Sequence, residues 1–175
     1  MTFRKDIERG LAGEKLLVGR LEKAGYSLIF PDKADRSYYD LAIKIGNEHF
    51  FFEVKYDEYA VKSGNLAFEF CNPKKGSYSG IMVTNAHFWC QIIPYDEPKI
   101  LVAPTEVLID IVQEHVIKGH KSKIKKKHLK IVAEAGDGNA SLVLYQLSEI
   151  RDLFLDFNAA TDKEIKKFIE ENHGG

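Results

Sequence analysis

The sequence predicts a mixed α/β fold in which a small mixed β-sheet is flanked by helices. Three observations predict it: a helical stretch near the start, several short strand-like stretches after it, and a second helical stretch beyond residue 104. The chain has 175 residues and 45% of them are hydrophobic, which is enough for a core of its own. We therefore expect a single domain over residues 1–175.

The first expected element is a helix over residues 4–25, ended by Gly25. Its apolar residues recur at helical spacing, at Ile7, Leu11, Val18 and Leu21. The same spacing places Glu14 within this apolar stripe. A carboxylate on a buried face needs a cation, a metal or a proton, so Glu14 is a candidate functional residue. The alternative is a stripe drawn slightly off its axis, with Glu14 solvated at its edge.

Two strand-like stretches follow, at residues 39–45 and 50–56. The Gly46-Asn47 pair between them is a turn signal, so we expect the two strands to form a hairpin. Pairing around this turn brings Asp40, at the start of the first strand, near the second strand. The alternative is an aspartate that merely ends a loop.

The second strand carries two opposite charges among aromatic residues. Because side chains alternate along a strand, Glu53 and Lys55 share a face with Phe51, and Phe52 and Val54 take the other face. Asp40 should then lie within side-chain reach of Glu53. An edge strand with a solvated polar face is the simpler explanation of the Glu-Val-Lys triplet.

The rest of the chain continues the mixed pattern. We expect a C-terminal hairpin around the turn signal at 136–139, followed by short helices. A core over about 4–104 would carry the basic segment 118–130 and the hairpin 129–147 as an extension. The other expected elements are a strand at 66–71, a short helical turn at 84–88, strands at 89–94 and 100–103, a helix at 105–117 with Thr105 as N-cap, and helices within 148–155 and 162–171.

Basic residues are concentrated in one segment of the chain. Seven lysines, two histidines and no acidic residue lie between residues 118 and 130, although the net charge of the whole chain is −1. Such a concentration predicts contact with a polyanion at one place. A solvated connector between a helix and a hairpin is the alternative.

Together, the charged residues resemble a known family. Asp40, then twelve residues, then Glu53-Val54-Lys55, with Glu14 on the preceding helix, is similar to the PD-(D/E)XK nuclease superfamily. Tyr39 stands where the nominal motif has proline. Glu14 matches the helix glutamate of the Holliday-junction-resolvase branch, and the segment 64–89 is similar to phage-encoded nucleases of the superfamily. The resemblance covers roughly residues 10–147.

The resemblance implies a restriction-endonuclease-like core and a DNA endonuclease that prefers branched DNA such as a Holliday junction. Asp40, Glu53 and the main-chain carbonyl of Val54 would hold Mg²⁺, for which Mn²⁺ would substitute. Lys55 would orient the attacking water and offset developing negative charge. Glu14 would bind a second metal or position Lys55. The resemblance also implies a homodimer.

Two further groups of residues are candidates for the same site. Glu69 takes the face of its strand opposite to Leu66 and Phe68, which would place it beside Glu53; a solvated outer face is an equal alternative. In a nuclease the basic segment would contact DNA phosphates. The lysines expected to do so are Lys121, Lys123, Lys125, Lys126 and Lys127.

Three other hypotheses stay open at this point. Within the enzymes, the alternative is a restriction-like or nicking endonuclease. From another class comes a DNA-binding module on the same fold without catalysis. The third is a globular protein in which the Glu-Val-Lys triplet is accidental, and it predicts that the four charged residues do not converge.

The start of the chain, MTFRKDIERG, is charged and lacks the apolar run of a signal peptide. No apolar stretch in the sequence is long enough to cross a bilayer. We therefore expect a soluble cytoplasmic protein with no membrane partner. A phage-encoded nuclease would act inside the host cell.

Overall fold

The computed structural model describes residues 3–32, 39–117, 129–135 and 139–172. It has the mixed α/β architecture expected from the sequence, with sheets flanked by helices. Contacts within the chain divide it into two compact units, and the single domain expected over residues 1–175 stays a prediction. Unit 1 comprises Met1–Glu58, Asn85–Pro104 and Phe154–Gly175, and unit 2 comprises Tyr59–Thr84 and Thr105–Leu153.

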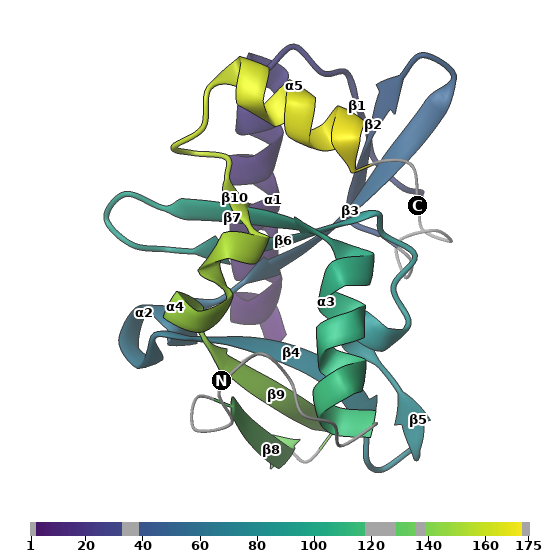
Figure 1. Cartoon of the computed structure of the whole chain (residues 1–175), viewed down its shortest axis with the longest axis vertical. Coiled ribbons are helices and arrows are strands. Elements are labelled where there is room, and N and C mark those ends of the chain that lie inside the picture. Colours follow the sequence, from purple (N-terminus) through teal and green to yellow (C-terminus); the bar gives the residue numbers. More distant parts are fainter. Residues whose placement is uncertain (1–2, 33–38, 118–128, 136–138, 173–175) are drawn as a thin grey trace. The chain divides into compact units, whose positions relative to one another are not determined.

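Unit 1 is built on a six-stranded sheet with the strand order β1-β2-β3-β6-β7-β10. β3 lies inside the sheet, antiparallel to β2 and parallel to β6. Helices α1 and α5 pack against one face of this sheet (Figure 1). The elements are α1 (Phe3–Lys23), β1 (Leu28–Ile29), β2 (Leu41–Ile45), β3 (Glu48–Tyr56), β6 (Phe88–Ile93), β7 (Lys99–Pro104), β10 (Leu155–Asp156) and α5 (Asp162–Glu171).

The apolar core of unit 1 buries one side of β3. Phe52 and Val54 point into it, and the ring of Phe52 stacks on that of Phe88 with 5.0 Å between the centroids. Leu17 of α1 and Ile165 of α5 complete the core from the helical side. This packing leaves the opposite side of β3, with its charged residues, outside the core.

The β2–β3 hairpin confirms the predicted pairing. The register runs from Leu41↔Phe52 to Ile45↔Glu48, so Gly46 and Asn47 form the connecting turn. Gly46 has a φ of 60°, a conformation that glycine adopts without steric cost. The sequence therefore determines this register through its turn residues.

A buried arginine ties α1 to the chain segment that leads into α5. Arg20 is 8% exposed and donates from Nε to the main-chain oxygen of Phe157 at 2.6 Å. Its two terminal nitrogens donate to the main-chain oxygen of Ala160 at 2.6 Å and to Asp162 Oδ1 at 2.7 Å. A buried guanidinium needs such partners, so these bonds set the position of α1 in unit 1.

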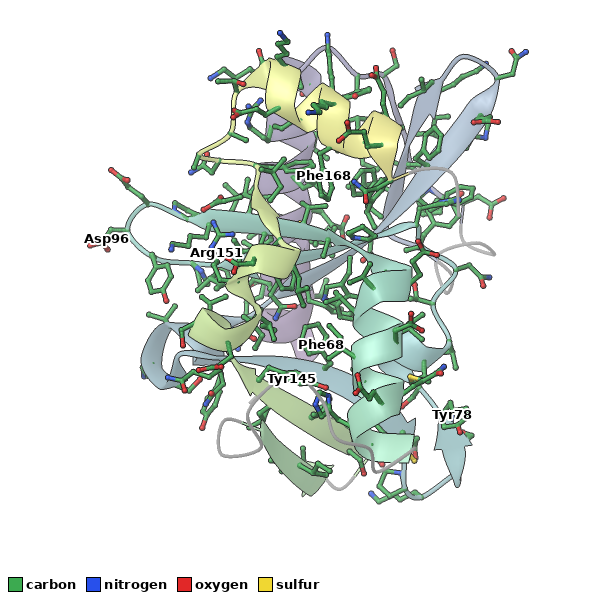
Figure 2. The ribbon with its side chains drawn as sticks, viewed as in Figure 1. Phe68, Tyr78, Asp96, Tyr145, Arg151 and Phe168 are labelled. Carbon is green, nitrogen blue, oxygen red and sulfur yellow. The ribbon has the colours of Figure 1, made fainter. Side chains whose placement is uncertain are left out.

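Unit 2 holds a four-stranded sheet with the order β5-β4-β9-β8. The rings of Phe68 on β4 and Tyr145 on β9 meet edge to face, with 5.8 Å between the centroids (Figure 2). The elements are β4 (Asn65–Asn72), β5 (Ser77–Tyr78), the 3₁₀ turn η2 (Gly80–Met82), α3 (Thr105–Val112), the π-helical turn η3 (Gln113–Ile117), β8 (Leu129–Ala135), β9 (Ala140–Gln146), α4 (Leu147–Ile150) and the 3₁₀ turn η5 (Arg151–Leu153). The short helix α2 (Glu58–Ser63) begins at the last residue of a unit 1 segment.

The structure corrects three details of the prediction. The strand expected at 66–71 is present as β4, but it belongs to the second sheet, where it pairs with the C-terminal hairpin strand β9. The helical turn expected at 84–88 is wrong, because the turn lies at η2 instead. Thr105 is the first residue of α3 rather than a cap preceding it.

Three further predictions concern the C-terminal hairpin, the basic segment and the absence of a membrane-spanning helix. The antiparallel pairing of β8 and β9 confirms the C-terminal hairpin, while its turn residues 136–138 lie outside the described residues. The basic segment lies outside them as well, from 118 to 128. No helix among the described residues combines the length and apolar character needed to cross a bilayer.

Candidate active site

β3 presents two chemically different faces. Phe50, Phe52 and Val54 are buried in the core of unit 1, whereas Phe51, Glu53 and Lys55 are half-buried on the other face. This alternation confirms the prediction for the strand. The two charges therefore stand side by side where solvent and a ligand have access.

Asp40 directly precedes β2, whose first residue Leu41 pairs with Phe52 of β3. The N–H of Asp40 donates to the main-chain oxygen of Phe52 at 2.9 Å. Its carboxylate oxygen Oδ2 accepts the main-chain N–H of Val54 at 2.7 Å. β2 stops short of Val54, so the Asp40 side chain takes the place of a strand as partner of that N–H. Asp40 is thus within reach of Glu53, as the sequence predicted.

Two acidic neighbours, Glu53 and Glu14, act on the carboxylate of Asp40. Burial raises the pKa of Asp40 from 3.8 to about 6, and the negative charge of Glu53 adds to this effect. The hydrogen bond from Val54 and the charge of Lys55 act in the opposite direction, and Glu14 raises the pKa further. Because the causes that raise the pKa outweigh those that lower it, a nearby cation would stabilise the charged form of Asp40.

Lys55 supplies the positive charge of the cluster. Its ammonium group forms an ion pair with Oε1 of Glu53. It also lies over the indole ring of Trp89, 5.5 Å from the centroid, which is a favourable cation–π distance. Trp89 is the β6 residue registered with Glu53, so both partners of Lys55 come from adjacent positions of the sheet.

A chain of polar side chains that includes the buried Gln91 holds the Trp89 ring. The indole N–H of Trp89 donates to Gln91 Oε1 at 3.0 Å, and Gln91 Nε2 donates to Asp57 Oδ2 at 2.8 Å. Gln91 is 1% exposed. Sequence reasoning did not single out these residues. The signal was the one polar residue in the apolar strand FWCQII, since a buried amide needs partners.

Glu14 lies at the edge of the buried stripe of α1. The predicted stripe is wrong at Ile7 and Leu11, which are 48% and 44% exposed. The buried positions of the helix instead include Gly13 and Leu17. A side chain on Gly13 would come within 3.3 Å of Tyr56, so glycine lets α1 approach β3 closely. Glu14, one residue further, is half-buried and within electrostatic range of Asp40.

The oxygen donors here fit a hard divalent cation. Among the described residues, no three side chains of histidine, cysteine, aspartate or glutamate form a group that could hold a metal ion. Mg²⁺ needs fewer, because it is usually bound by one or two carboxylates and keeps several waters. Asp40 and Glu53 would provide the two carboxylates. The Val54 N–H donates to Asp40, and the Val54 carbonyl lies on the same edge of the strand.

The remaining predicted site residues belong to unit 2. Glu69 is half-buried on β4 of unit 2, next to a β-bulge between Glu69 and Cys71. Gly80 packs against its main chain so closely that a Cβ there would meet the Glu69 oxygen at 2.4 Å. The lysines Lys121, Lys123, Lys125, Lys126 and Lys127 lie outside the described residues. Their roles stay predictions.

Comparisons with known proteins give little beyond this geometry. No model of a protein family matches the chain, and no curated protein matches it. Among solved structures, the chain is similar to a bacterial homing endonuclease with a TM-score of 0.47 and 20% sequence identity, over 58% of this chain and 70% of that chain. A likeness of this size transfers neither a residue role nor a substrate.

Proposed function

We propose that this chain is a metal-dependent DNA endonuclease that hydrolyses phosphodiester bonds and is selective for branched DNA such as a Holliday junction. The observation that carries the proposal is the convergence of Asp40, Glu53 and Lys55 at one end of β3. An accidental Glu-Val-Lys triplet would leave these groups apart. Two carboxylates and an ammonium group in a partly desolvated place are the groups that phosphodiester hydrolysis needs.

Mg²⁺ is the proposed cofactor, and Mn²⁺ is expected to substitute for it. Asp40, Glu53 and the Val54 carbonyl would hold the ion, since Mg²⁺ prefers oxygen ligands. The raised pKa of Asp40 supports this assignment, because a cation would relieve the repulsion from Glu53 and Glu14. When bound, such an ion lowers the pKa of a coordinated water and polarises the phosphate.

Lys55 is the proposed partner of the reacting phosphate. Its ammonium group would orient the attacking water and offset the negative charge that develops on the phosphate oxygens. The ion pair with Glu53 and the contact with Trp89 keep the ammonium group near this place without substrate. Glu14 would position Lys55 or bind a second ion.

Binding of DNA would extend beyond the chemical site. The lysines of the basic segment are proposed to contact backbone phosphates, which gives affinity and a strong dependence on salt but no choice of sequence. Glu69 is proposed as an additional site residue.

The first test is cleavage of a four-way junction, a linear duplex and single-stranded DNA, with and without Mg²⁺. We expect the wild-type protein to cut the junction only with Mg²⁺. Lys55→Ala should lower the rate by about 100-fold or more, as loss of one transition-state contact does. The substitution removes a half-exposed side chain from the strand surface, so the fold should survive.

Lys99→Ala is the matched control. Lys99 is also a strand lysine over an aromatic ring, with its ammonium 5.9 Å from the Tyr95 centroid, but it lies on β7. Its loss should leave cleavage unchanged. If no DNA is cut but salt-sensitive binding remains, the chain is a DNA-binding module on this fold. Equal cleavage by Lys55→Ala and wild type would exclude the proposed site.

A further inference from the structure

β3 extends beyond its neighbour β6 at its N-terminal end. Pairing with β2 covers Glu48 to Phe52, whereas pairing with β6 begins only at Phe52↔Phe88. Among the residues that the structure describes, no strand pairs with residues 48–51 on the β6 side, which leaves an edge of β3 there. Because backbone groups at such an edge lack a strand partner, they need a side chain, water or a ligand.

His87, the residue before β6, satisfies one of these groups. Its Nδ1 accepts the main-chain N–H of Phe51 at 3.0 Å. An accepting Nδ1 places the ring proton on Nε2, and burial lowers the pKa of His87, which favours this neutral form. The imidazole is therefore held in one orientation with Nε2–H free of the Phe51 bond and able to act as a donor.

Aromatic rings are packed together around this bond. The His87 ring stacks on Phe51, with 5.2 Å between the centroids and 25° between the planes. It meets Phe50 edge to face at 5.6 Å. Tyr39 packs against Phe51 at 4.4 Å. These contacts fix the rings before any ligand arrives, which reduces the entropic cost of binding.

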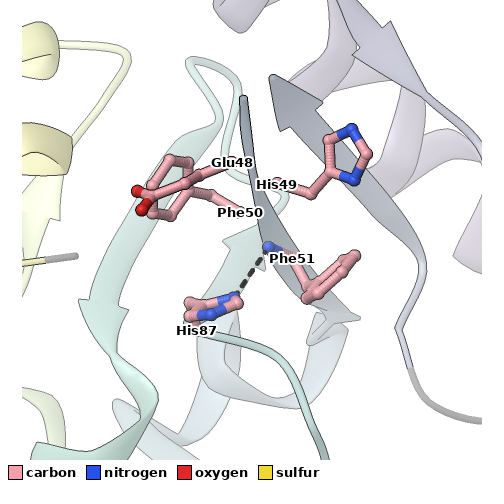
Figure 3. A pocket seen from close by; sticks show the side chains of 5 residues that line it. All are labelled: Glu48, His49, Phe50, Phe51 and His87. Atoms are coloured by element: carbon pink, nitrogen blue, oxygen red, sulfur yellow. Dashed lines mark hydrogen bonds between the residues drawn. The ribbon is translucent and has the colours of Figure 1, made fainter. Parts of the chain in front are cut away.

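The rings line an open hollow of about 410 Å³ formed by Glu48, His49, Phe50, Phe51 and His87 (Figure 3). Its volume lies in the range of small-molecule sites. None of these lining residues is a lysine or arginine, and Glu48 places a carboxylate at the hollow. Such a lining disfavours a phosphate and favours a flat, uncharged ring that carries hydrogen-bond donors.

The hollow adjoins the candidate active site. Phe51 precedes Glu53 by two residues on the same face of β3, about 7 Å along the strand. Tyr39 directly precedes Asp40. A group bound in the hollow would therefore be a near neighbour of a phosphate at Asp40, Glu53 and Lys55.

We propose that this hollow binds an unpaired nucleobase of DNA next to the phosphate that is cut. The base stacks on the exposed ring of His87, which Phe51 supports from its other face, and an amino group of the base donates to Glu48. A base inside a duplex is paired and stacked, so it must leave the helix to enter. This inference rests on the proposed function and names a substrate feature that it favours: an unpaired nucleotide beside the scissile phosphate.

The test measures binding in the absence of divalent cations, so that no cleavage occurs. Three labelled duplexes are compared: one with a single unpaired cytosine, one with an abasic nucleotide in its place, and one fully paired. We expect the duplex with cytosine to bind about tenfold more tightly than the other two, the size of one base-stacking contact. Equal affinity for all three duplexes would overturn the proposal without use of any variant.

Phe51→Leu removes the ring and keeps an apolar side chain, and it should abolish the preference for cytosine over the abasic nucleotide. Phe30→Leu is the matched control, because Phe30 is 55% exposed in unit 1 and does not line the hollow. Glu48→Gln, at an exposed position, should weaken cytosine binding while the protein stays folded. An unchanged preference in both Phe51→Leu and Glu48→Gln contradicts the site.

The same duplexes with Mg²⁺ separate this inference from the proposed function. A preference for cytosine in binding, with no cleavage of any duplex, supports the hollow and contradicts the catalytic part of the proposed function. Cleavage of the paired, abasic and cytosine duplexes at equal rates supports the nuclease and overturns the hollow.

Discussion

The two ends of β3 solve one structural problem with different chemistry. At each end a neighbouring strand stops short and leaves a main-chain N–H without a strand partner. Asp40 accepts the N–H of Val54 at 2.7 Å, and His87 accepts that of Phe51 at 3.0 Å. The first acceptor stands among other charges, and the second stands among aromatic rings.

This difference shows in how each side chain holds its proton. Burial and neighbouring negative charge raise the pKa of Asp40 to about 6, whereas burial lowers the pKa of His87. A cation would therefore stabilise the charged carboxylate of Asp40, whereas the imidazole of His87 is kept neutral. One strand thus offers a place for a metal and a phosphate at one end and a place for a base at the other.

The largest effect is expected from removing the charge of Asp40 while keeping the bond to Val54. Asp40→Asn retains an oxygen that can accept the Val54 N–H, but it loses the negative charge that a cation needs. We expect cleavage to fall by about 1000-fold, as for loss of a principal catalytic group. The measurement is the single-turnover cleavage rate at saturating protein.

Asp40→Ala separates the two roles of this residue. It should lose the same activity and should also be less stable than Asp40→Asn by about 1–3 kcal/mol, because the Val54 N–H then lacks a partner. Chemical denaturation measures this difference. A variant Asp40→Asn with near wild-type cleavage would show that Asp40 is only a structural cap, like His87.

A smaller effect concerns the dependence of stability on pH, where the two side chains should act in opposite directions. The folded protein raises the pKa of Asp40 from 3.8 to about 6, so it binds more protons than the unfolded chain between these pH values. The free energy of unfolding should therefore fall as pH rises through this range, by about 3 kcal/mol. Asp40→Asn should remove this fall and be the more stable protein at neutral pH.

His87 should contribute with the opposite sign. Its pKa is lowered from 6.5, so its contribution to stability is present above pH 6.5 and is lost as pH falls through its value in the folded protein. Titration by NMR of both side chains checks the two directions. Added Mg²⁺ should lower the apparent pKa of Asp40 and leave that of His87 unchanged. A shift of both by Mg²⁺ would place the ion away from the proposed ligands.

The sequence was sufficient for the charged end of this strand because local rules determine it. A two-residue turn at Gly46-Asn47 sets the register, and the register brings Asp40 to Glu53. Alternation then places Lys55 on the same face as Glu53. None of these steps depends on contacts between distant parts of the chain.

The helix shows where local rules fail. Apolar spacing counted Ile7 and Leu11 as buried, but the helix packs through Gly13, where the small residue permits close approach to Tyr56. Hydrophobic periodicity does not register a glycine as a contact residue. Arg20 was missed for a related reason, since its burial depends on acceptors at Phe157 and Ala160, far along the chain.

The sequence also could not predict the hydrogen bond between Phe51 and His87. His87 caps Phe51 only because β6 begins one residue after it, in parallel register with β3. Parallel pairing joins strands that are far apart in sequence, and no turn residue encodes its register. The separate sheet that contains β4 was also unpredictable, because β4 pairs antiparallel with β9, a strand that is far away in sequence and joined to it by no short turn.

The smallest expected effect tests the cap at the aromatic end. His87→Ala leaves the Phe51 N–H at an edge that water can reach, so we expect a loss of about 1 kcal/mol in the free energy of unfolding. His87→Asn, which can still present an acceptor, should recover part of it. Cleavage of DNA without an unpaired base should be unaffected in both. A residue that only binds a base can affect only substrates that offer an unpaired base. If His87→Ala instead lowered cleavage of every DNA as strongly as Asp40→Asn, the two ends of β3 would form one catalytic site.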